Sequence, residues 1–240
     1  MSLNLRAVHD LECLMAPFQA TNKVSEAFPG LNFYGVKIEN LEITEKLLYV
    51  KARKKKIQKD FRESYTIDNL KEAYQVKAIR DLFVAMGANP DERLNAVENL
   101  AALLLRGGLP SINSAVDSCN LASLQTLMQI GVFDAGKVAG TIVLDLSEAE
   151  EAYEAIGMEK EVLTEGLVIL RDDEGVISRP MFKDSKKTMI TDSTQDVYII
   201  TVQYPPIKDE DAKNALEVAV DLVTTSSQGC AGPIQKFSGE

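Results

Sequence analysis

The sequence predicts an α+β fold, with a helical half followed by a largely antiparallel β half. Apolar side chains recur at helical spacing through residues 68–128. After residue 134 the chain changes to short runs of branched and aromatic residues, separated by turn signals, which are typical of antiparallel strands. Helices and strands therefore come in separate blocks without strand–helix alternation, and this order favours α+β over a parallel α/β sheet.

Spacing and stop signals give the predicted elements. Asp68 is the expected N-cap of one helix, and Gly87 and Gly107 each follow an apolar-periodic segment as helix stops. We expect helices over residues 24–28, 40–57, 68–86, 91–106, 112–128 and 209–223. We expect strands over residues 31–38, 141–146, 166–170, 176–179 and 197–203, a turn over residues 131–134, and a mobile tail from Thr224.

Composition limits the class of protein. The chain has 240 residues, of which 45% are hydrophobic, and this is enough for one large core or two small ones. It contains neither an apolar run long enough for a membrane helix nor a signal-peptide pattern. Three widely spaced cysteines match no disulfide or metal pattern, so we expect a cytoplasmic protein without a metal or another cofactor.

Common catalytic motifs are absent from the sequence. The only histidine, His9, lies in an apolar N-terminal segment, which favours a structural role over acid–base catalysis. No glycine-rich nucleotide loop and no nucleophile elbow is found. Cys119 has no histidine partner and is expected to be a buried, inert thiol.

Charge is unevenly distributed along the chain. The formal net charge is −10, which disfavours non-specific nucleic-acid binding. Residues 51–62 nevertheless contain seven basic residues and one acid. This basic cluster is either a solvated helix face or a contact for an RNA phosphate backbone, and the sequence leaves both open.

Residues 107–134 organise the rest of the chain. Asn113, Asp117 and Asn120 lie at positions i, i+4 and i+7, so they share one face of the predicted helix. Buried polar side chains need hydrogen-bond partners, and these three can bond to neighbouring loop backbone. The alternative is that they shape a pocket, and spacing alone leaves both possibilities open.

This stretch resembles the editing domain of the phenylalanyl-tRNA synthetase beta subunit, which comprises its third and fourth B modules and also occurs as freestanding proteins. The similarity lies in the run from Leu109 to Asn120, in Leu124, and in the Gly-Val-Phe-Asp of residues 131–134. Further matches are residues 80–90, residues 173–179, and Asp184, Ser185, Thr188 and Thr194. The resemblance covers about residues 60–205, and no catalytic synthetase core or anticodon module is present.

The resemblance implies an α+β domain whose cleft, between helical and β halves, hydrolyses tRNA mischarged with tyrosine. Gly131 and Cys119 stand where the bacterial proteins carry a histidine and a threonine. The strand over residues 197–203 has no glutamate to recognise the tyrosine hydroxyl. Tyrosine specificity is therefore not implied for this chain.

We accordingly predict a domain over residues 61–206 that binds the aminoacylated 3′ end of tRNA, flanked by an N-terminal extension (1–60) packed on the same domain and a C-terminal helix and tail (207–240). Whether it deacylates tRNA in trans is left open, and neither aminoacylation nor DNA binding is expected. The alternative is a non-catalytic module for an amino-acid-like ligand or a protein partner. The predicted catalytic residues are Asn113 and Asn120; the substrate-binding residues are Asp117, Cys119, Gly131, Ser185 and Thr188; the RNA-binding residues are Lys54, Lys55, Lys56 and Lys59.

Overall fold

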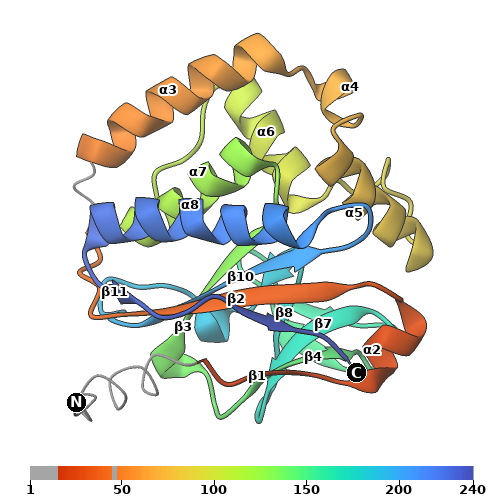
Figure 1. The fold of residues 1–240 in the computed structure, drawn as a ribbon. Coiled ribbons are helices and arrows are strands. Elements are labelled where there is room, and N and C mark those ends of the chain that lie inside the picture. Colours follow the sequence, from red (N-terminus) through yellow and green to blue (C-terminus); the bar gives the residue numbers. More distant parts are fainter. Residues whose placement is uncertain (1–15, 45–47, 240) are drawn as a thin grey trace, which may run out of the picture.

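The predicted α+β class is confirmed: most of the helices lie on one side of two mostly antiparallel sheets (Figure 1). The computed structural model describes residues 16–44 and 48–239, so His9 and Cys13 lie outside the described residues. None of the described helices is both long and apolar enough to cross a membrane. The helices are α2 (Asn22–Ala27), α3 (Leu48–Ser64), α4 (Ile67–Leu70), α5 (Tyr74–Ala85), α6 (Ala96–Arg106), α7 (Ser114–Thr126) and α8 (Asp209–Ser227).

Three helix predictions need correction, and capping explains two of them. The helix expected over residues 68–86 is two helices, because Thr66 and Asn69 form a capping box that starts α4 and Ala73 is extended before α5. The helix expected from residue 91 starts at Ala96, because Asn95 and Glu98 cap each other. The helix expected over residues 40–57 corresponds to α3, which begins at Leu48 and ends at Ser64. Asn40, where the predicted helix would begin, has a left-handed backbone (φ 60°) and is not helical.

The first sheet places β10 (Val197–Gln203) between β2 (Asn32–Glu39) and β3 (Ile130–Asp134), all antiparallel. All seven residues of β10 are buried, because α8 packs on one face of this sheet and the second sheet lies toward the other (Figure 1). The turn predicted over residues 131–134 is therefore wrong. These residues form a strand because they pair with the middle strand of the sheet.

The C-terminal tail is also ordered, contrary to the prediction of a mobile segment. Strands β11 (Cys230–Ala231) and β12 (Gln235–Phe237) both pair with the outer edge of β2. The Phe237 ring stacks on Phe18, with centroids 4.8 Å apart. The tail thus covers an edge that would otherwise leave backbone groups unpaired.

The second sheet has the order β1 (Phe18–Ala20), β4 (Ile142–Leu146), β7 (Val168–Asp172), β8 (Gly175–Arg179) and β9 (Lys183–Asp184). Only the β1–β4 pair is parallel within this sheet. A small hairpin of β5 (Ala152–Glu154) and β6 (Lys160–Val162) lies beside it, and the short 3-10 turns η1 (Ala135–Lys137) and η2 (Lys186–Thr188) follow β3 and β9. This arrangement sets β8 and β9 opposite β3 and β10.

Candidate functional site

A cavity of about 460 Å³ lies between the two sheets, and we call it the inter-sheet cavity. One wall comes from β2, β3 and β10, the other from β7, β8 and β9, and the helical half supplies the rim. Its lining residues are Phe33, Ala96, Leu100, Leu103, Pro110, Ile112, Asn120, Gln129, Ile130, Gly131, Phe133, Ile156, Leu170, Ser178, Pro180, Met181, Phe182, Lys183, Asp184, Ile200 and Val202. Most of these side chains are apolar, as is typical of small-ligand sites.

Strand register explains which side chains face the inter-sheet cavity. Gly131 lies directly opposite Ile200 across β3 and β10, so both project from the same face of the sheet. On the second sheet, Ser178 lies opposite both Leu170 and Asp184. Two cross-strand rows, one from each sheet, therefore line the cavity.

Gly131 leaves space that a larger residue would fill. A Cβ atom at this position would lie 3.0 Å from the Phe133 ring and 3.9 Å from Asp184 Oδ2. A side chain here would thus project between β3 and the carboxylate of the second sheet. Glycine at position 131 keeps this part of the cavity open.

Asp184 is the only carboxylate among the described residues that line the inter-sheet cavity. Its Oδ1 accepts a hydrogen bond from Ser178 Oγ at 2.7 Å, its cross-strand neighbour. Burial in these surroundings raises the pKa of the Asp184 carboxyl to about 6, although the Ser178 hydrogen bond lowers it. The carboxyl is therefore mostly ionised at neutral pH, at a cost in desolvation.

The helical side supplies Asn120 and an apolar rim. Asn120 is half-buried on α7, and it lines the cavity. Leu103, Ile112 and Ile156 line it too, although they are 48%, 53% and 38% exposed. Large exposed apolar side chains around an opening are typical of a surface that contacts a ligand.

The wall formed by residues 180–182 is fixed to the helical half. Met181 has a left-handed backbone (φ 73°), and its carbonyl accepts a hydrogen bond from Ala96 N at the start of α6. The Phe182 ring stacks on Phe83, with centroids 4.3 Å apart, and the Arg179 guanidinium lies 4.1 Å from its centroid. Through these contacts, residues 180–182 connect the β half of the domain to helices α5 and α6.

The other residues predicted on α7 lie outside the cavity lining. Asn113 caps α7, because its Oδ1 accepts from Val116 N at 3.0 Å. Asp117 accepts from Ile112 N at 2.9 Å and from Ser111 Oγ at 2.8 Å, and so holds the loop before the helix. Cys119 is buried, and burial raises the pKa of its thiol to about 12, so it is not a ready nucleophile.

Ser185 and Thr188 also lie away from the inter-sheet cavity. Ser185 Oγ accepts from Lys187 N at 3.2 Å and caps η2. It lines a shallow depression that includes Lys186 and Lys187. Thr188 is buried, and its Oγ1 has no hydrogen-bond partner among the described residues.

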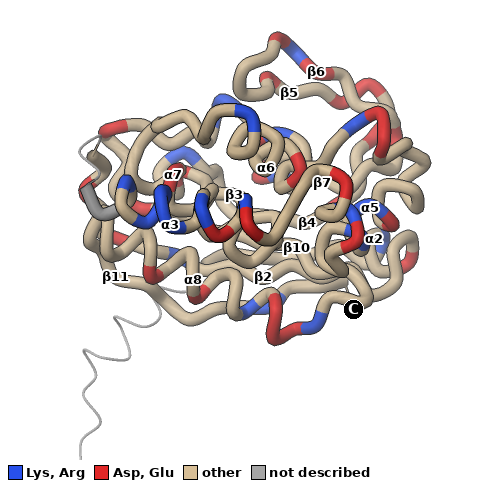
Figure 2. Tube along the Cα trace, turned by 90° about the horizontal axis from the view of Figure 1, so that it is seen from above, with Lys and Arg blue, Asp and Glu red and all other residues tan. Residues whose placement is uncertain are grey.

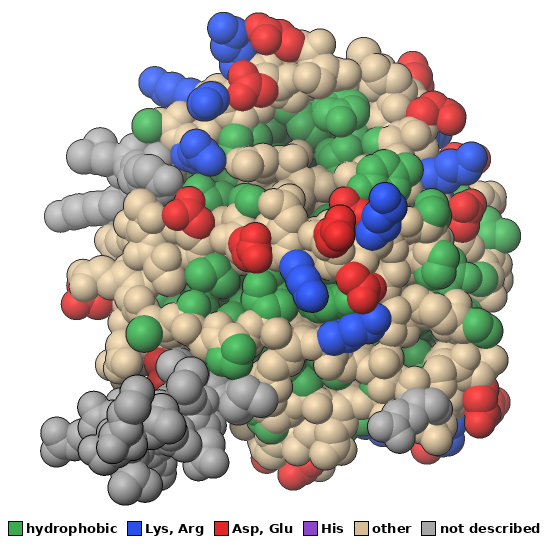
Figure 3. All heavy atoms as spheres, viewed as in Figure 1, with side chains coloured by type: hydrophobic (Ala, Val, Ile, Leu, Met, Phe, Trp, Pro, Cys, Tyr) green, Lys and Arg blue, Asp and Glu red, His purple; other side chains and the backbone are tan. Residues whose placement is uncertain are grey.

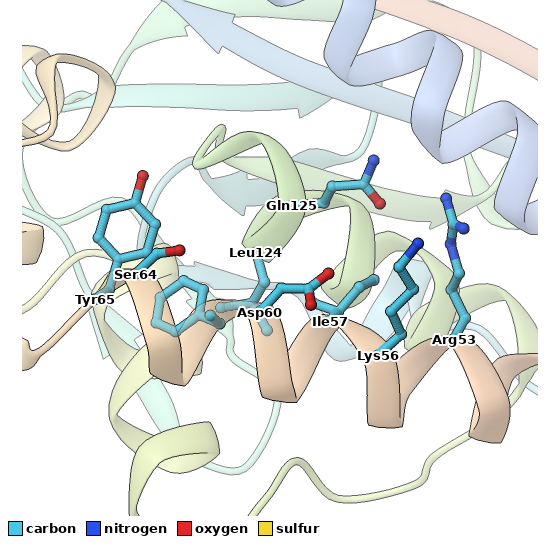
Figure 4. Close-up of a pocket in the computed structure, with 9 residues that line it drawn as sticks. Arg53, Lys56, Ile57, Asp60, Ser64, Tyr65, Leu124 and Gln125 are labelled. Atoms are coloured by element: carbon cyan, nitrogen blue, oxygen red, sulfur yellow. The ribbon is translucent and has the colours of Figure 1, made fainter.

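A second hollow lies between α3 and α7, and we call it the α3 groove (Figures 3 and 4). It measures about 300 Å³ and is lined by Arg53, Lys56, Ile57, Asp60, Phe61, Ser64, Tyr65, Leu124 and Gln125. The Lys and Arg positions of α3 cluster along this helix in Figure 2. The groove combines a basic side with an aromatic pair, the buried Phe61 and the half-buried Tyr65, whose ring centroids lie 5.0 Å apart.

The four lysines predicted to bind RNA have different environments on α3. Lys54 donates to the carbonyls of Leu109 and Pro110, so it holds the loop before α7. Lys59 lies 3.8 Å from Glu63 in an exposed ion pair. Lys55 is exposed beside Lys59, and Lys56 lines the α3 groove with Arg53.

Sequence reasoning missed Asp184 and Gln129 as lining residues, and also missed Arg53. Asp184 lies in a segment that carries the family resemblance. The side to which its carboxylate points, however, depends on the pairing of β8 with β9. Gln129 precedes β3, which we had predicted as a turn. Arg53 lies three residues before Lys56, so the two side chains share one face of a helix. This spacing could have predicted that Arg53 lies beside Lys56.

The structure defines an α+β domain with a cavity between its two sheets, and comparison with known proteins identifies its family. The family model described as "B3/4 domain" matches residues 78–228, which is more than half of the chain. The chain therefore belongs to the B3/4 domain family. The resemblance to the B3/B4 region of the phenylalanyl-tRNA synthetase beta subunit is thereby confirmed.

Two relatives show the extent of this similarity. The phenylalanine–tRNA ligase beta subunit of Psychrobacter arcticus is 24% identical over 132 residues, which are 55% of this chain and 16% of that protein. The corresponding subunit of Corynebacterium glutamicum is 34% identical over 96 residues, 40% of this chain and 11% of that protein. The match thus spans a small part of each relative.

Among solved structures, an N-terminal fragment of the phenylalanyl-tRNA synthetase beta subunit from Pyrococcus horikoshii is similar to this chain. It is 17% identical, with a TM-score of 0.46, and the match covers 93% of this chain and 51% of that one.

Proposed function

We propose that this chain binds the aminoacylated 3′ end of a tRNA, places the aminoacyl group in the inter-sheet cavity, and hydrolyses the ester. The observation that carries the proposal is the cavity itself, which is mostly apolar, is large enough at about 460 Å³ to hold an aminoacyl group, and is lined in part by Asn120, Gly131 and Asp184. The relatives that this chain matches in part are named as beta subunits of phenylalanine–tRNA ligase.

The apolar walls support an apolar aminoacyl side chain as the group that enters. Ile200, Val202 and Phe33 form one wall, where a glutamate or other hydroxyl-binding carboxylate is absent among the lining residues of β10 and β2. Burial of an apolar side chain contributes roughly 25 cal/mol per Å² of surface removed from water. The exposed rim residues Leu103 and Ile112 would then contact the terminal nucleotide.

Hydrolysis would use a positioned water rather than a covalent intermediate. Cys119 lies outside the cavity lining, and none of the lining residues is a histidine or cysteine. Water attacks the ester carbonyl, the bond to the ribose oxygen breaks, and the ribose oxygen leaves with a proton. The Asn120 amide would donate to the carbonyl oxygen, and the neighbouring ribose hydroxyl would assist the proton transfer. Asn113 would act indirectly, by capping α7.

The α3 groove supports contact with the tRNA backbone. Arg53 and Lys56 line it, and neither cation forms an ion pair with an acid among the residues that the structure describes. α3 packs against α7, whose Asn120 lines the cavity, so the groove and the cavity share one helix. An RNA strand that contacts α3 would thus lie on an element that also lines the cavity.

A deacylation assay tests the proposal. A panel of tRNAs, each charged with a different apolar amino acid, would be incubated with excess chain, and the released amino acid measured. We expect release above the buffer rate for at least one member, and an Asn120→Ala chain about 100-fold slower on it. Asn99→Ala, on the exposed face of α6, is the matched control and should retain the wild-type rate.

The assay also separates the proposal from a non-catalytic binding module. If no member of the panel is deacylated, the hydrolytic function is wrong. Tight, salt-sensitive binding of charged tRNA without release would then leave a binding module, because phosphate contacts release counterions.

A further inference from the structure

Asp184 is an anion without a matching cation. No Lys or Arg within the described ranges 16–44 and 48–239 forms an ion pair with it. Its Oδ1 is satisfied by Ser178, whereas Oδ2 lies toward Gly131 on the opposite sheet. Lys183 is the only Lys or Arg among the described residues that line the cavity, and it donates instead to the Ile156 carbonyl at 3.3 Å. The free carboxylate oxygen therefore faces the space that a ligand would occupy.

Gln129 provides a second unpaired acceptor. It is 5% exposed and lines the same cavity, and its Oε1 has no hydrogen-bond partner in the part of the chain that the structure describes. The orientation of the Gln129 side-chain amide is fixed by Asn95. Asn95 Oδ1 already accepts a hydrogen bond from Glu98 N, so this atom is an acceptor and the Gln129 atom that faces it must be the donor Nε2, at 3.1 Å. Oε1 is thus left as a buried acceptor, which is costly unless a ligand supplies a donor.

We infer that Asp184 and Gln129 bind a primary ammonium group, so that the inter-sheet cavity selects ligands whose amino group is unblocked. This inference rests on the proposed function and names the part of the aminoacyl group that is recognised. An ammonium carries a positive charge and three donors, which suit a carboxylate and an amide oxygen in apolar surroundings. An N-acylated amino group loses the charge and most of the donors.

The same charges indicate that the ligand's own carboxyl is esterified or amidated. A free amino acid would bring a carboxylate into a cavity whose only lining cation is already directed at the Ile156 carbonyl. It would also place that carboxylate near Asp184. Esters and amides of apolar amino acids should therefore bind more tightly than the free amino acids.

Small probes without tRNA test this inference. L-leucinamide and L-phenylalaninamide would each be compared with the N-acetylated amide and with the free amino acid by calorimetry at pH 7.5. We expect at least one amide to bind, at least ~10-fold more tightly than its N-acetyl counterpart. Asp184→Asn should abolish that preference, whereas Asp60→Asn, a carboxylate of the α3 groove, should keep it.

Three results would overturn the inference. These are equal affinity for blocked and unblocked amides, no binding by either unblocked amide, or a preference that survives Asp184→Asn. The first two results come from the unmodified chain, so they do not depend on how the variant folds.

The probes contain no ester, so they separate this inference from the proposed function. Selective amide binding without tRNA deacylation would retain the ammonium site and refute hydrolysis. Deacylation that proceeds equally fast on N-acetylaminoacyl-tRNA and on unblocked aminoacyl-tRNA would support hydrolysis and refute the ammonium site.

Discussion

The inter-sheet cavity and the α3 groove differ in how they are built. The cavity is walled by strands that are distant in sequence, such as β3 and β10, and it holds one carboxylate among apolar residues. The groove draws seven of its nine lining residues from α3 and the residue that follows it, and it is basic at one end. The cavity is thus suited to select a small ligand, and the groove to add affinity for a polyanion that carries it.

The largest expected effect comes from filling the cavity. Gly131→Val would place methyl groups against the Phe133 ring and toward Asp184, because a Cβ alone reaches within 3.0 Å of that ring. We expect amide binding and any deacylation to fall at least ~100-fold while tRNA affinity stays within a few fold. Calorimetry with L-leucinamide and a filter-binding assay with tRNA measure the two effects.

Two controls accompany this variant. Gly107→Val adds the same volume at a position where a Cβ would meet nothing within 4 Å. This variant should change neither L-leucinamide binding nor tRNA binding. Val202→Phe fills the cavity from β10 and should reproduce the loss. Wild-type ligand binding by both filled variants would show that the ligand does not enter this cavity.

The next effect concerns stability and its pH dependence. The pKa of the Asp184 carboxyl is raised from 3.8 to about 6 in the folded chain. Between these two pH values the carboxyl is therefore ionised in the unfolded chain but still protonated in the folded chain. The stability contributed by Asp184 is therefore intact below about pH 4 and is lost as pH rises to about 6. Asp184→Asn should be more stable than wild type at pH 7, by on the order of 3 kcal/mol, and equal to it near pH 4. Urea unfolding at both pH values measures this.

Asp172 gives the control of opposite sign. Burial alone would raise its pKa, but hydrogen bonds from Lys187 and from the Ala139 and Glu174 amides lower it overall. Its stabilising contribution is present above its ordinary pKa and is lost as pH falls. Asp172→Asn should thus be less stable than wild type at pH 7, and a gain in stability there would contradict the electrostatic account.

A smaller effect is expected from the α3 groove. Arg53→Glu combined with Lys56→Glu should weaken tRNA binding at least ~10-fold and reduce the slope of log affinity against log salt by more than 1, because each lost phosphate contact removes roughly 0.7–0.9. L-leucinamide binding should not change. Lys23→Glu combined with Lys213→Glu, at two exposed sites, controls for the same change in net charge. An unchanged salt slope would exclude the groove from the RNA contact.

The smallest effect separates two asparagines of one motif. Asn113→Ala removes the N-cap of α7 and should lower the free energy of unfolding by about 1 kcal/mol. Asn120→Ala should leave unfolding nearly unchanged, since it is a half-buried cavity residue. Chemical denaturation of both variants tests this, and equal destabilisation would contradict the division of roles.

Local sequence patterns predicted most of the fold because helical and strand periodicities are local signals. Strand β10 was predicted at its observed limits, whereas β3 was mistaken for a turn. A five-residue segment such as β3 becomes a strand through its partner, and local sequence does not reveal that partner. The cap at Asn95 was visible as an Asn-x-x-Glu pattern, and we had placed the helix start too early.

The candidate site was less predictable than the fold. The motif on α7 led to Asn120 and Gly131, both of which line the cavity. Its other polar residues, Asn113 and Asp117, bond to nearby backbone. Asp184 faces the cavity only because β9 pairs with β8, and such cross-strand placement is a property of the whole sheet.

The most direct test of the account is an NMR titration of the chain with an aminoacyl-adenosine whose ester is replaced by an amide. We predict saturable chemical-shift changes at the backbone amides of Asn120, Gly131 and Asp184, with Arg53 and Lys56 unaffected because the probe lacks a phosphate backbone. Saturable changes confined to α3, or none at the three cavity residues, would contradict it.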